Sequence, residues 1–297
     1  MSDVINTEDR LPTSIRIFLA DGRADGFRVV EKLNWTGLGL VCAQSDYTRV
    51  RTREEWGRTG VYLLTGPAEG DGLRERLYIG EGDDVRYRVD SHLRTKDFWT
   101  NVVAFTSRDD NLNKAHVRYL EARLLQLAAK ADRVVLMNGT APAVPRLSEA
   151  DCADMEGYLD EMLVILPMLG IVAFKPVADP STSTERLLLV GKGAEAKGAD
   201  DSEGFVVFSG SVARLSEVPS IHAYLATLRA RLVEDGVLVA DGPGLRFTKS
   251  YVFNSPSTAA GVVLGRSANG RIEWKDQTGA TLKQRQESAL VASSPPF

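Results

Sequence analysis

The sequence predicts an α+β protein with a small N-terminal domain of strands and helices and a separate α+β C-terminal domain. Short apolar segments bounded by Gly, Asn and Asp indicate strands. Between them, apolar residues recur at helical spacing. The length of 297 residues exceeds the common size of one domain, and a composition of 43 % hydrophobic and 26 % charged residues is typical of globular proteins with packed cores.

Residues 1–55 are predicted to form a strand-rich N-terminal extension. SIRIFLA (14–20) alternates apolar and polar residues, Asp21-Gly22 offers a turn, and GFRVVEK resumes the alternation, which indicates a hairpin. The apolar run LGLVCA, which follows Trp35, indicates a further strand.

Residues 56–150 are predicted to form a domain of three strands and two helices. The strands are expected at GVYLL (60–64), RLYIG (76–80) and FWTNVVAFTS (98–107). Asp83 or Asp84 can cap a helix that ends near Leu93, and Asn111 or Asn113 can start a longer helix that ends near Lys130. The longer helix carries an apolar stripe at helical spacing, made of Val117, Leu120, Leu124 and Leu127.

The remaining chain is predicted to hold a helix with a linker (151–200), the C-terminal domain (201–285) and a flexible tail (286–297). GKGAEAKGADDSEG (191–204) has the composition of an exposed loop. In the C-terminal domain we expect a strand at FVVFSG, a helix near 218–234, and a helix capped by serine with Pro256 in its first turn. SANGRIEWKDQTGATL is predicted to be a hairpin with turns at Asn269-Gly270 and Thr278-Gly279.

Composition excludes several classes of protein. A net charge of −4 excludes a wholly basic protein that coats nucleic acid. Cys42 and Cys152 are too few for a disulfide framework, and neither belongs to a Cys-x-x-Cys pair of a zinc ribbon. The longest apolar run, 162–174, is too short to span a bilayer, and the polar N-terminus does not resemble a signal peptide. We therefore expect a cytoplasmic protein with no membrane partner.

Several polar residues of the middle segment form an unusual set. Two neighbouring strands carry Tyr62 and Tyr78, and Arg88 and His92 are four residues apart on one helix face. Glu121 lies at the edge of an apolar stripe, where a partly desolvated carboxylate needs a partner such as a cation. Each residue alone has an ordinary interpretation, packing for the tyrosines and a solvated charge for the glutamate, but together they predict a site.

At these residues the chain resembles the GIY-YIG nuclease family, over about residues 56–140. Gly60-Val61-Tyr62 stands for the first signature, and Tyr78-Ile79-Gly80 is the second. The further matches are Arg88 to the catalytic arginine, His92 to a histidine of several members, Glu121 to the metal-binding glutamate and Asn138 to a later asparagine.

The resemblance implies a three-stranded antiparallel sheet flanked by helices and metal-dependent hydrolysis of phosphodiester bonds in nucleic acid, with DNA as the first expectation. It implies that Glu121 holds Mg²⁺ or Mn²⁺, hard cations that accept one carboxylate and several waters. Arg88 would stabilise the phosphate with its bidentate guanidinium group. Tyr62 would be the general base and Tyr78 a positioning group, although the two roles can be exchanged. Because the ordinary pKa of tyrosine is about 10, such a base needs a lowered pKa or an onward proton acceptor, which His92 provides if it lies within hydrogen-bond reach.

Two departures bear on this function. The segment between Tyr62 and Tyr78 is longer than the commonest family spacing, which lengthens a hairpin loop. Residues 51–130 hold 14 basic and 13 acidic residues, a thin electrostatic footprint for a nucleic-acid-binding domain. A local basic patch is formed by Arg86, Arg88, Arg94 and Lys96, unless these residues belong to a solvated face neutralised by Glu81, Asp83, Asp84 and Asp90.

The C-terminal segment resembles an uncharacterised domain that is often appended to GIY-YIG and restriction-related proteins, and its stretch SPSTAAGVVLGRSANGRIEWK is similar to a domain thought to read DNA. This resemblance implies that DNA phosphates are contacted by polar side chains, namely Lys249, Arg266, Asn269, Arg271 and Lys275. It also implies that the Trp274 ring stacks on a base. The alternative is that Trp274 packs the hairpin and the charged residues solvate it.

The sequence thus predicts a metal-dependent endonuclease whose C-terminal domain aids target recognition. The alternative is a non-catalytic nucleic-acid- or protein-binding module that retains the nuclease fold, and a third interpretation is another phosphotransfer or hydrolase chemistry in the same pocket. A homodimer would suit cleavage of both strands, but no interface residue can be named from the sequence.

Overall fold

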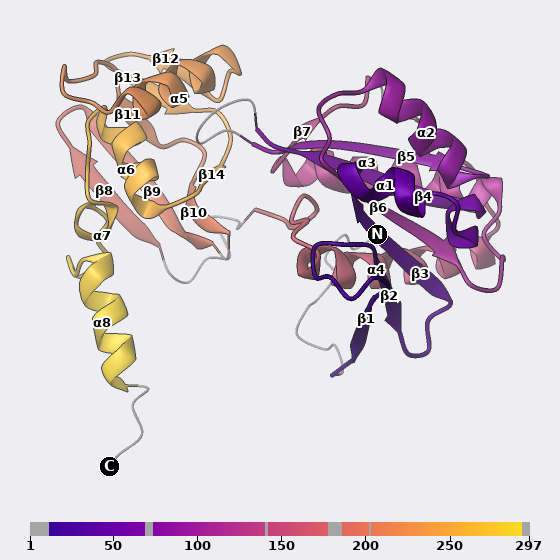
Figure 1. Ribbon diagram of the computed structural model, residues 1–297. Helices are drawn as coiled ribbons and strands as arrows, with labels where there is room; N and C mark the ends of the chain where they lie inside the picture. Colours follow the sequence, from indigo (N-terminus) through magenta and orange to yellow (C-terminus); the bar gives the residue numbers. More distant parts are fainter. Residues whose placement is uncertain (1–11, 69–73, 140–141, 178–185, 202, 293–297) are drawn as a thin grey trace. The chain divides into compact units, whose positions relative to one another are not determined.

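The computed structural model describes residues 12–68, 74–139, 142–177, 186–201 and 203–292. They form two compact units, each built around its own β-sheet (Figure 1). The first unit contains nearly all described residues up to 174, and the second contains those from 175 onward together with short segments that include 131–133. The chain is therefore α+β with two sheets, as predicted. No helix among the described residues is long and apolar enough to cross a membrane.

The first unit contains a seven-stranded sheet. Its order is β1-β2-β3-β6-β4-β5-β7, and every neighbouring pair is antiparallel except β5 and β7. The strands are β1 (Ile15–Leu19), β2 (Arg28–Lys32), β3 (Gly37–Ala43), β4 (Gly60–Gly66), β5 (Arg76–Gly82), β6 (Asn101–Ser107) and β7 (Val135–Leu136).

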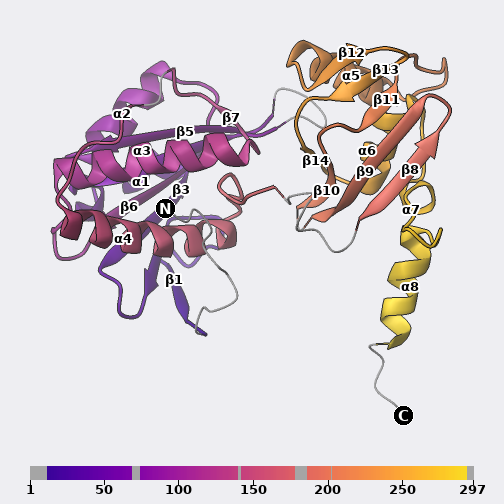
Figure 2. The same ribbon diagram turned by 180° about the vertical axis from the view of Figure 1, so that it is seen from behind.

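Helices cover both faces of this sheet (Figures 1 and 2). They are α1 (Gln44–Val50), the 3₁₀ helix Glu54–Gly57, α2 (Val85–Thr95), α3 (Lys114–Ala131) and α4 (Glu149–Met168). Side chains alternate between the faces along a strand. Val61 and Leu63 pack with α3 and α4 in one core, whereas Tyr62 and Leu64 belong to a second core with α1 and α2.

Two predicted helix starts are confirmed by their caps, and α4 is capped in the same way. The Asp84 side chain accepts a hydrogen bond from the backbone N–H of Tyr87 at 3.0 Å. Asn113 Oδ1 accepts from two backbone N–H groups of the first turn of α3, at 2.9 and 3.1 Å. Ser148 Oγ accepts from Asp151 N at 3.1 Å and begins α4. These side chains satisfy backbone donors that have no partner within the helix.

The strand-rich segment that we predicted as an N-terminal extension is part of the sheet of the first unit. β3 pairs with β6 along seven residue pairs, and β1 and β2 continue the sheet beyond it. The predicted boundary between residues 55 and 56 therefore lies within one folded unit. Of the expected three strands, β4 lies in the middle and pairs antiparallel with both β5 and β6. The sheet is larger than three strands because β3, buried on both faces, pairs with β6 and connects β2 and β1 to it.

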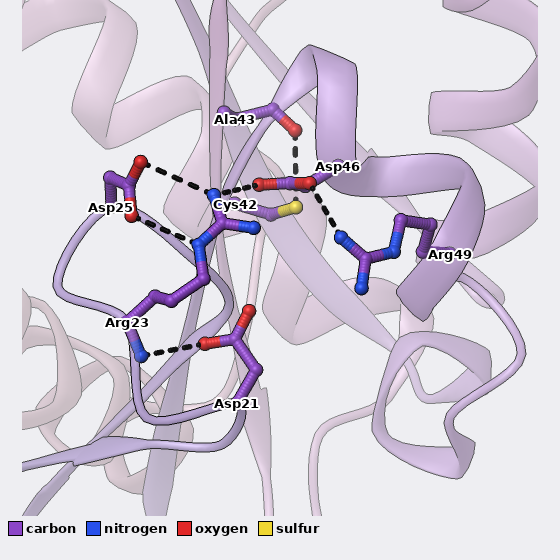
Figure 3. Close-up of polar contacts among 7 residues, drawn as sticks. All are labelled: Asp21, Arg23, Asp25, Cys42, Ala43, Asp46 and Arg49. Atoms are coloured by element: carbon purple, nitrogen blue, oxygen red, sulfur yellow. Dashed lines mark hydrogen bonds and ion pairs between the residues drawn. The ribbon is translucent and has the colours of Figure 1, made fainter.

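The predicted turn at Asp21-Gly22 is also confirmed, and ion pairs link it to α1 (Figure 3). The Arg23 guanidinium group lies 3.2 Å from an Asp25 carboxylate oxygen and 3.3 Å from Asp46 in α1. Gly22 adopts a φ of +75°, which favours glycine. The thiol of Cys42 donates to the Ala43 carbonyl oxygen at 3.1 Å, so this buried cysteine has a structural role.

The second unit also contains a seven-stranded sheet. Its main path is β12-β13-β11-β9-β10-β14, and β8 pairs with β9. The strands are β8 (Leu187–Gly191), β9 (Ala194–Asp201), β10 (Gly204–Val207), β11 (Val212–Arg214), β12 (Leu238–Asp241), β13 (Gly244–Phe247) and β14 (Tyr251–Phe253). The helices are α5 (Ala223–Glu234), α6 (Pro256–Leu264), α7 (Gly270–Glu273) and α8 (Leu282–Ala292).

Helix α6 lies in the core of the second unit and begins where the sequence predicts. Ser255 Oγ accepts from Thr258 N at 3.1 Å, and Pro256 occupies the first turn. Residues 259–264 are buried, and Gly265 ends the helix with a φ of +63°. A serine cap, an N-terminal proline and a C-terminal glycine together define a short apolar helix.

The predicted exposed loop at 191–204 is wrong, because most of it forms β9. Its residues alternate, with Ala194 and Ala196 buried and Glu195 and Lys197 exposed. The inward positions are occupied by alanine, and such small side chains give little hydrophobic signal in the sequence.

Two further predictions of the second unit need correction. Asn269 caps the short helix α7 and does not make a hairpin turn, since its Oδ1 accepts from Arg271 N at 3.1 Å. The predicted tail at 286–297 is helical up to residue 292, and residues 293–297 lie outside the described part of the chain. The turn at Thr278-Gly279 is present, with Gly279 at a φ of +87°.

Candidate functional site

Antiparallel pairing of β4 and β5 places the two tyrosines together. Tyr62 lies opposite Gly80, and Tyr78 lies opposite Leu64, so both phenol rings project from the face covered by α2. Their ring centroids are 6.3 Å apart. Tyr62 is fully buried, whereas Tyr78 is half-buried.

Gly80 makes room for the Tyr62 ring. A Cβ atom at position 80 would lie 2.4 Å from the Tyr62 hydroxyl oxygen and 3.0 Å from the Tyr78 ring. Both distances are too short for a carbon atom without displacement of a ring. The glycine that ends the Tyr78-Ile79-Gly80 motif therefore has a steric function at this site.

Helix α2 brings His92 against both tyrosines. His92 Nε2 lies 2.8 Å from the Tyr62 hydroxyl oxygen, so the condition of hydrogen-bond reach is met. The His92 ring also packs edge-on against Tyr78, with centroids 4.9 Å apart. His92 is only 8 % exposed, and its Nδ1 has no hydrogen-bond partner within the described residues.

The surroundings hold Tyr62 protonated and His92 neutral. Burial raises the pKa of Tyr62 above its usual value, and the charge of Arg88 partly opposes this effect. Burial also lowers the pKa of His92 to about 4, and the nearby Lys96 and Arg88 cations act in the same direction. A neutral imidazole can accept the Tyr62 proton at Nε2. Of the two conditions for a tyrosine base, the protein thus offers an onward acceptor but no lowered tyrosine pKa.

Glu121 in α3 is electrostatically coupled to the same residues. Burial raises its pKa to about 7, the charge of Glu81 adds to this shift, and Arg88 opposes it. Burial raises the pKa of Tyr62 and of Tyr78, and the Glu121 charge adds to both shifts. A half-buried carboxylate beside a second carboxylate is stabilised by a bound cation, so the donor chemistry fits a divalent metal.

Glu121 would act as a single protein ligand. Within the described residues, no group of three or more His, Cys, Asp and Glu side chains converges on a point that could hold a metal. The neighbouring Glu81 is occupied by Lys114, whose Nζ lies 2.7 Å from Glu81 Oε2. A hard cation that keeps most of its water ligands suits this arrangement better than one that needs a full protein cage.

Asn138, which we predicted among the catalytic residues, holds the edge of β5. Its Oδ1 accepts from Ile79 N at 3.0 Å, and its Nδ2 donates to Ile79 O at 2.7 Å. The neighbouring strand β7 pairs only with Arg76 and Leu77, so the Asn138 amide replaces the next strand residue. This geometry gives Asn138 a positioning role between Tyr78 and Gly80.

The acidic residues near α2 have partners of their own. Asp84 contacts Arg86 at 3.2 Å, and Asp90 is held by Arg51 and by the Tyr47 hydroxyl.

Three of the predicted cations pair with no carboxylate within the described residues, namely Arg88, Arg94 and Lys96. Lys96 instead places its ammonium group 4.3 Å from the centroid of the Tyr78 ring. Of the four predicted basic residues, only Arg86 is neutralised locally.

Sequence reasoning missed Lys114 and Arg118 as neighbours of the site, and it expected Glu81 to neutralise the basic residues around α2. Lys114 and Arg118 are four residues apart on α3 and face Glu81, at 2.7 and 3.8 Å. Strand alternation was the available signal, because it places Glu81 on the face opposite to Tyr78, where α3 packs.

The predicted C-terminal contacts do not form a single free basic surface. Lys249 Nζ lies 2.6 Å from Asp132, and Arg266 lies 2.6 Å from Glu273. Arg271 Nε donates to Gln286 at 3.0 Å, while the backbone of Lys275 pairs with Leu188. Lys249 and Arg266 are thus paired with carboxylates, whereas phosphate binding by the side chains of Arg271 and Lys275 stays a prediction.

Trp274 is buried and cannot serve as an exposed stacking ring. Its Nε1 donates to Pro256 O at 3.1 Å, and its ring lies 4.6 Å from that of Phe205. The packing alternative is therefore correct for this residue.

Comparison with known proteins adds information on the second unit. Residues 187–286 match a family model. It is described as a domain of unknown function, DUF4357. The match begins at β8 and ends within α8, so this domain starts earlier than the predicted residue 201. No curated protein and no solved structure matched the chain.

Proposed function

We propose that the first unit is a metal-dependent endonuclease that hydrolyses phosphodiester bonds in nucleic acid, with DNA as the first substrate to test. The observation that carries the proposal is the 2.8 Å contact between Tyr62 and His92. The Arg88 cation and the Glu121 carboxylate both act electrostatically on the same tyrosine. The DUF4357 domain is proposed to contribute to target recognition.

The proton chemistry follows from the Tyr62–His92 pair. As water attacks the phosphorus atom, its proton passes to the Tyr62 oxygen while the Tyr62 proton passes to His92 Nε2. The products of this transfer are a neutral tyrosine and an imidazolium ion. His92 is neutral before the reaction, so its Nε2 can accept the proton, but the burial that lowers its pKa also disfavours the imidazolium ion.

Arg88, together with a divalent ion held by Glu121, would supply the positive charges that bind the phosphate. Arg88 offers two parallel donors to phosphate oxygens, and the donors can stabilise the negative charge that develops in the transition state. A divalent ion held by Glu121 would act as a Lewis acid on the phosphate and the leaving oxygen. Tyr78, half-buried beside His92, can orient the attacking water through its hydroxyl.

A cleavage assay with matched variants tests this function. We expect the full chain to cut single-stranded, duplex or branched DNA, or RNA, only with Mg²⁺ or Mn²⁺, and to lose at least a hundredfold in rate in Arg88→Ala and Glu121→Gln. The controls are the exposed Arg16→Ala on β1 and Glu149→Gln at the start of α4. A second readout is thermal stability, which Mn²⁺ should raise in the wild type but not in Glu121→Gln. Equal rates in the site variants and the controls would refute the proposal and favour a non-catalytic binding module.

A further inference from the structure

The outward face of α2 combines an exposed aromatic ring with cations. Tyr87, Ser91 and Arg94 follow one another at helical spacing, and all three are exposed. Tyr87 is 73 % exposed, and within the described part of the chain its ring and hydroxyl have no partner. Because the Tyr87 side chain is so exposed, packing in the core does not explain why a tyrosine occupies this position.

The charge of this face is positive, although the whole chain is acidic. Asp84 is occupied by the helix cap and by Arg86, and Asp90 by Arg51 and Tyr47. Arg94, on the outer side, and Arg88, whose side chain lies against Gly82 of β5, pair with no carboxylate within the described residues. A guanidinium group without a carboxylate partner is suited to phosphate oxygens, so Arg94 can bind a phosphate on the outer face and Arg88 one beside Tyr62.

This face adjoins the proposed catalytic residues. Arg88 follows Tyr87 directly in α2, and His92, one turn further along the same helix, contacts the Tyr62 hydroxyl oxygen at 2.8 Å. A nucleotide whose phosphate contacts Arg88 would therefore place the neighbouring base near the Tyr87 ring. The helix has 11 residues and is about 16 Å long, enough to follow a few nucleotides of one strand.

A stacking ring selects for unpaired bases. In a duplex the faces of each base are covered by its neighbours, whereas a base in a single strand, loop or flap exposes a face to an aromatic side chain. We propose that the outward face of α2 binds an unpaired nucleotide beside the scissile phosphate, with Tyr87 stacking on its base and Arg94 contacting the adjoining backbone. This proposal rests on the nuclease function proposed above.

Binding in the absence of metal tests the proposal separately from cleavage. Fluorescence anisotropy of the full chain, with excess chelator, would use a labelled DNA single strand, a flap of the same sequence and the matching blunt duplex. We expect Tyr87→Ala to weaken binding of the single strand and the flap about tenfold and to leave duplex binding unchanged. Tyr87→Phe, which keeps the ring, should bind like the wild type.

A second site variant, Arg94→Ala, and a control variant, Tyr224→Ala, complete the experiment. Arg94→Ala should weaken binding of all three ligands and reduce the dependence of affinity on salt by about one phosphate contact. Tyr224→Ala is the matched control, because Tyr224 is also an exposed helical tyrosine, in α5 of the second unit. Circular dichroism should show unchanged folding for Tyr87→Ala, since the side chain is exposed.

The outcomes separate the two proposals. The α2 proposal is overturned if Tyr87→Ala binds the single strand as tightly as Tyr224→Ala, if it weakens duplex binding equally, or if none of the three ligands binds. Cleavage by the wild type with normal binding by Tyr87→Ala would overturn only the α2 proposal. Binding that depends on Tyr87, without cleavage of any substrate, would support the proposal for the α2 face and refute the proposed nuclease function.

Discussion

Glu121 has its ionisation close to neutral pH because two effects act on its carboxyl group. Burial disfavours the charged form, and the Glu81 carboxylate repels it. The same residue would be the metal ligand. The charged Glu121 carboxylate therefore destabilises the metal-free protein at the place where a cation would bind. Residues that serve a function often lower the stability of the free protein, so that a substitution at such a position can raise it.

This cost predicts that Glu121→Gln stabilises the metal-free protein. The pKa of Glu121 rises to about 7 on folding, from an ordinary value of 4.5, so the folded state binds the proton more tightly. Stability is therefore lost as pH rises from about 4.5 through about 7, and the loss is complete above that range. At pH 8 with chelator, Glu121→Gln should be more stable than the wild type by about 1–2 kcal/mol in urea unfolding, and equally stable near pH 4.

The control for this prediction is Glu149→Gln, at an exposed carboxylate in the first turn of α4. It should show no such gain at pH 8, because its charge is solvated. A Glu121→Gln variant less stable than the wild type at pH 8 would show that the carboxylate is already compensated by groups such as Lys114, and would argue against an unmet need for a cation.

At the scale of elements, helix starts were predictable because they depend on local chemistry. Asp84, Asn113 and Ser255 each cap a helix through a side-chain oxygen that reaches a backbone N–H two or three residues on. The strand β9 was not predictable in the same way, because its inward positions are alanines and its burial depends on strands far along the chain. Likewise, the Tyr62–His92 contact could be anticipated from residue types, but the Asn138 contact with Ile79 depends on where β7 ends.

The role of Asn138 gives a prediction about the edge of β5. Asn138→Ala removes two hydrogen bonds to the backbone of Ile79 and leaves both groups without these partners. We expect a loss of about 1–3 kcal/mol in the free energy of unfolding, together with faster hydrogen exchange of the Ile79 amide. If nuclease activity is present, it should fall because Tyr78 and Gly80 flank the released residue.

Asn138→Asp distinguishes this role from direct catalysis. The aspartate keeps an acceptor for Ile79 N but lacks the donor for Ile79 O, so it should recover part of the stability. An Asn138→Ala variant with normal stability and normal exchange at Ile79, but without activity, would instead return Asn138 to the catalytic residues.

At the scale of the whole molecule, the number of units was predictable from length, but their composition was not. The segment up to residue 55 looks separate in the sequence because a polar stretch follows β3, yet backbone pairing with β6 makes it part of the first unit. α4 likewise packs into the core of the first unit through residues such as Leu159 and Met162. Such long-range pairings are set by the complete sheet, which local patterns do not reveal.

Separate hydrophobic cores predict that the two units unfold in separate transitions. The core of the second unit includes α6, which begins at the Ser255 cap, and the core behind Glu121 belongs to the first unit. In scanning calorimetry, Ser255→Ala should lower one transition by about 4–8 °C, since the loss of an N-cap costs about 1 kcal/mol. Mn²⁺ should raise the other transition, whereas Ser255→Thr, which can keep the cap, should leave both near their wild-type temperatures. A single transition that responds to both Ser255→Ala and Mn²⁺ would show that the units fold as one, and metal binding would then stabilise the second unit as well.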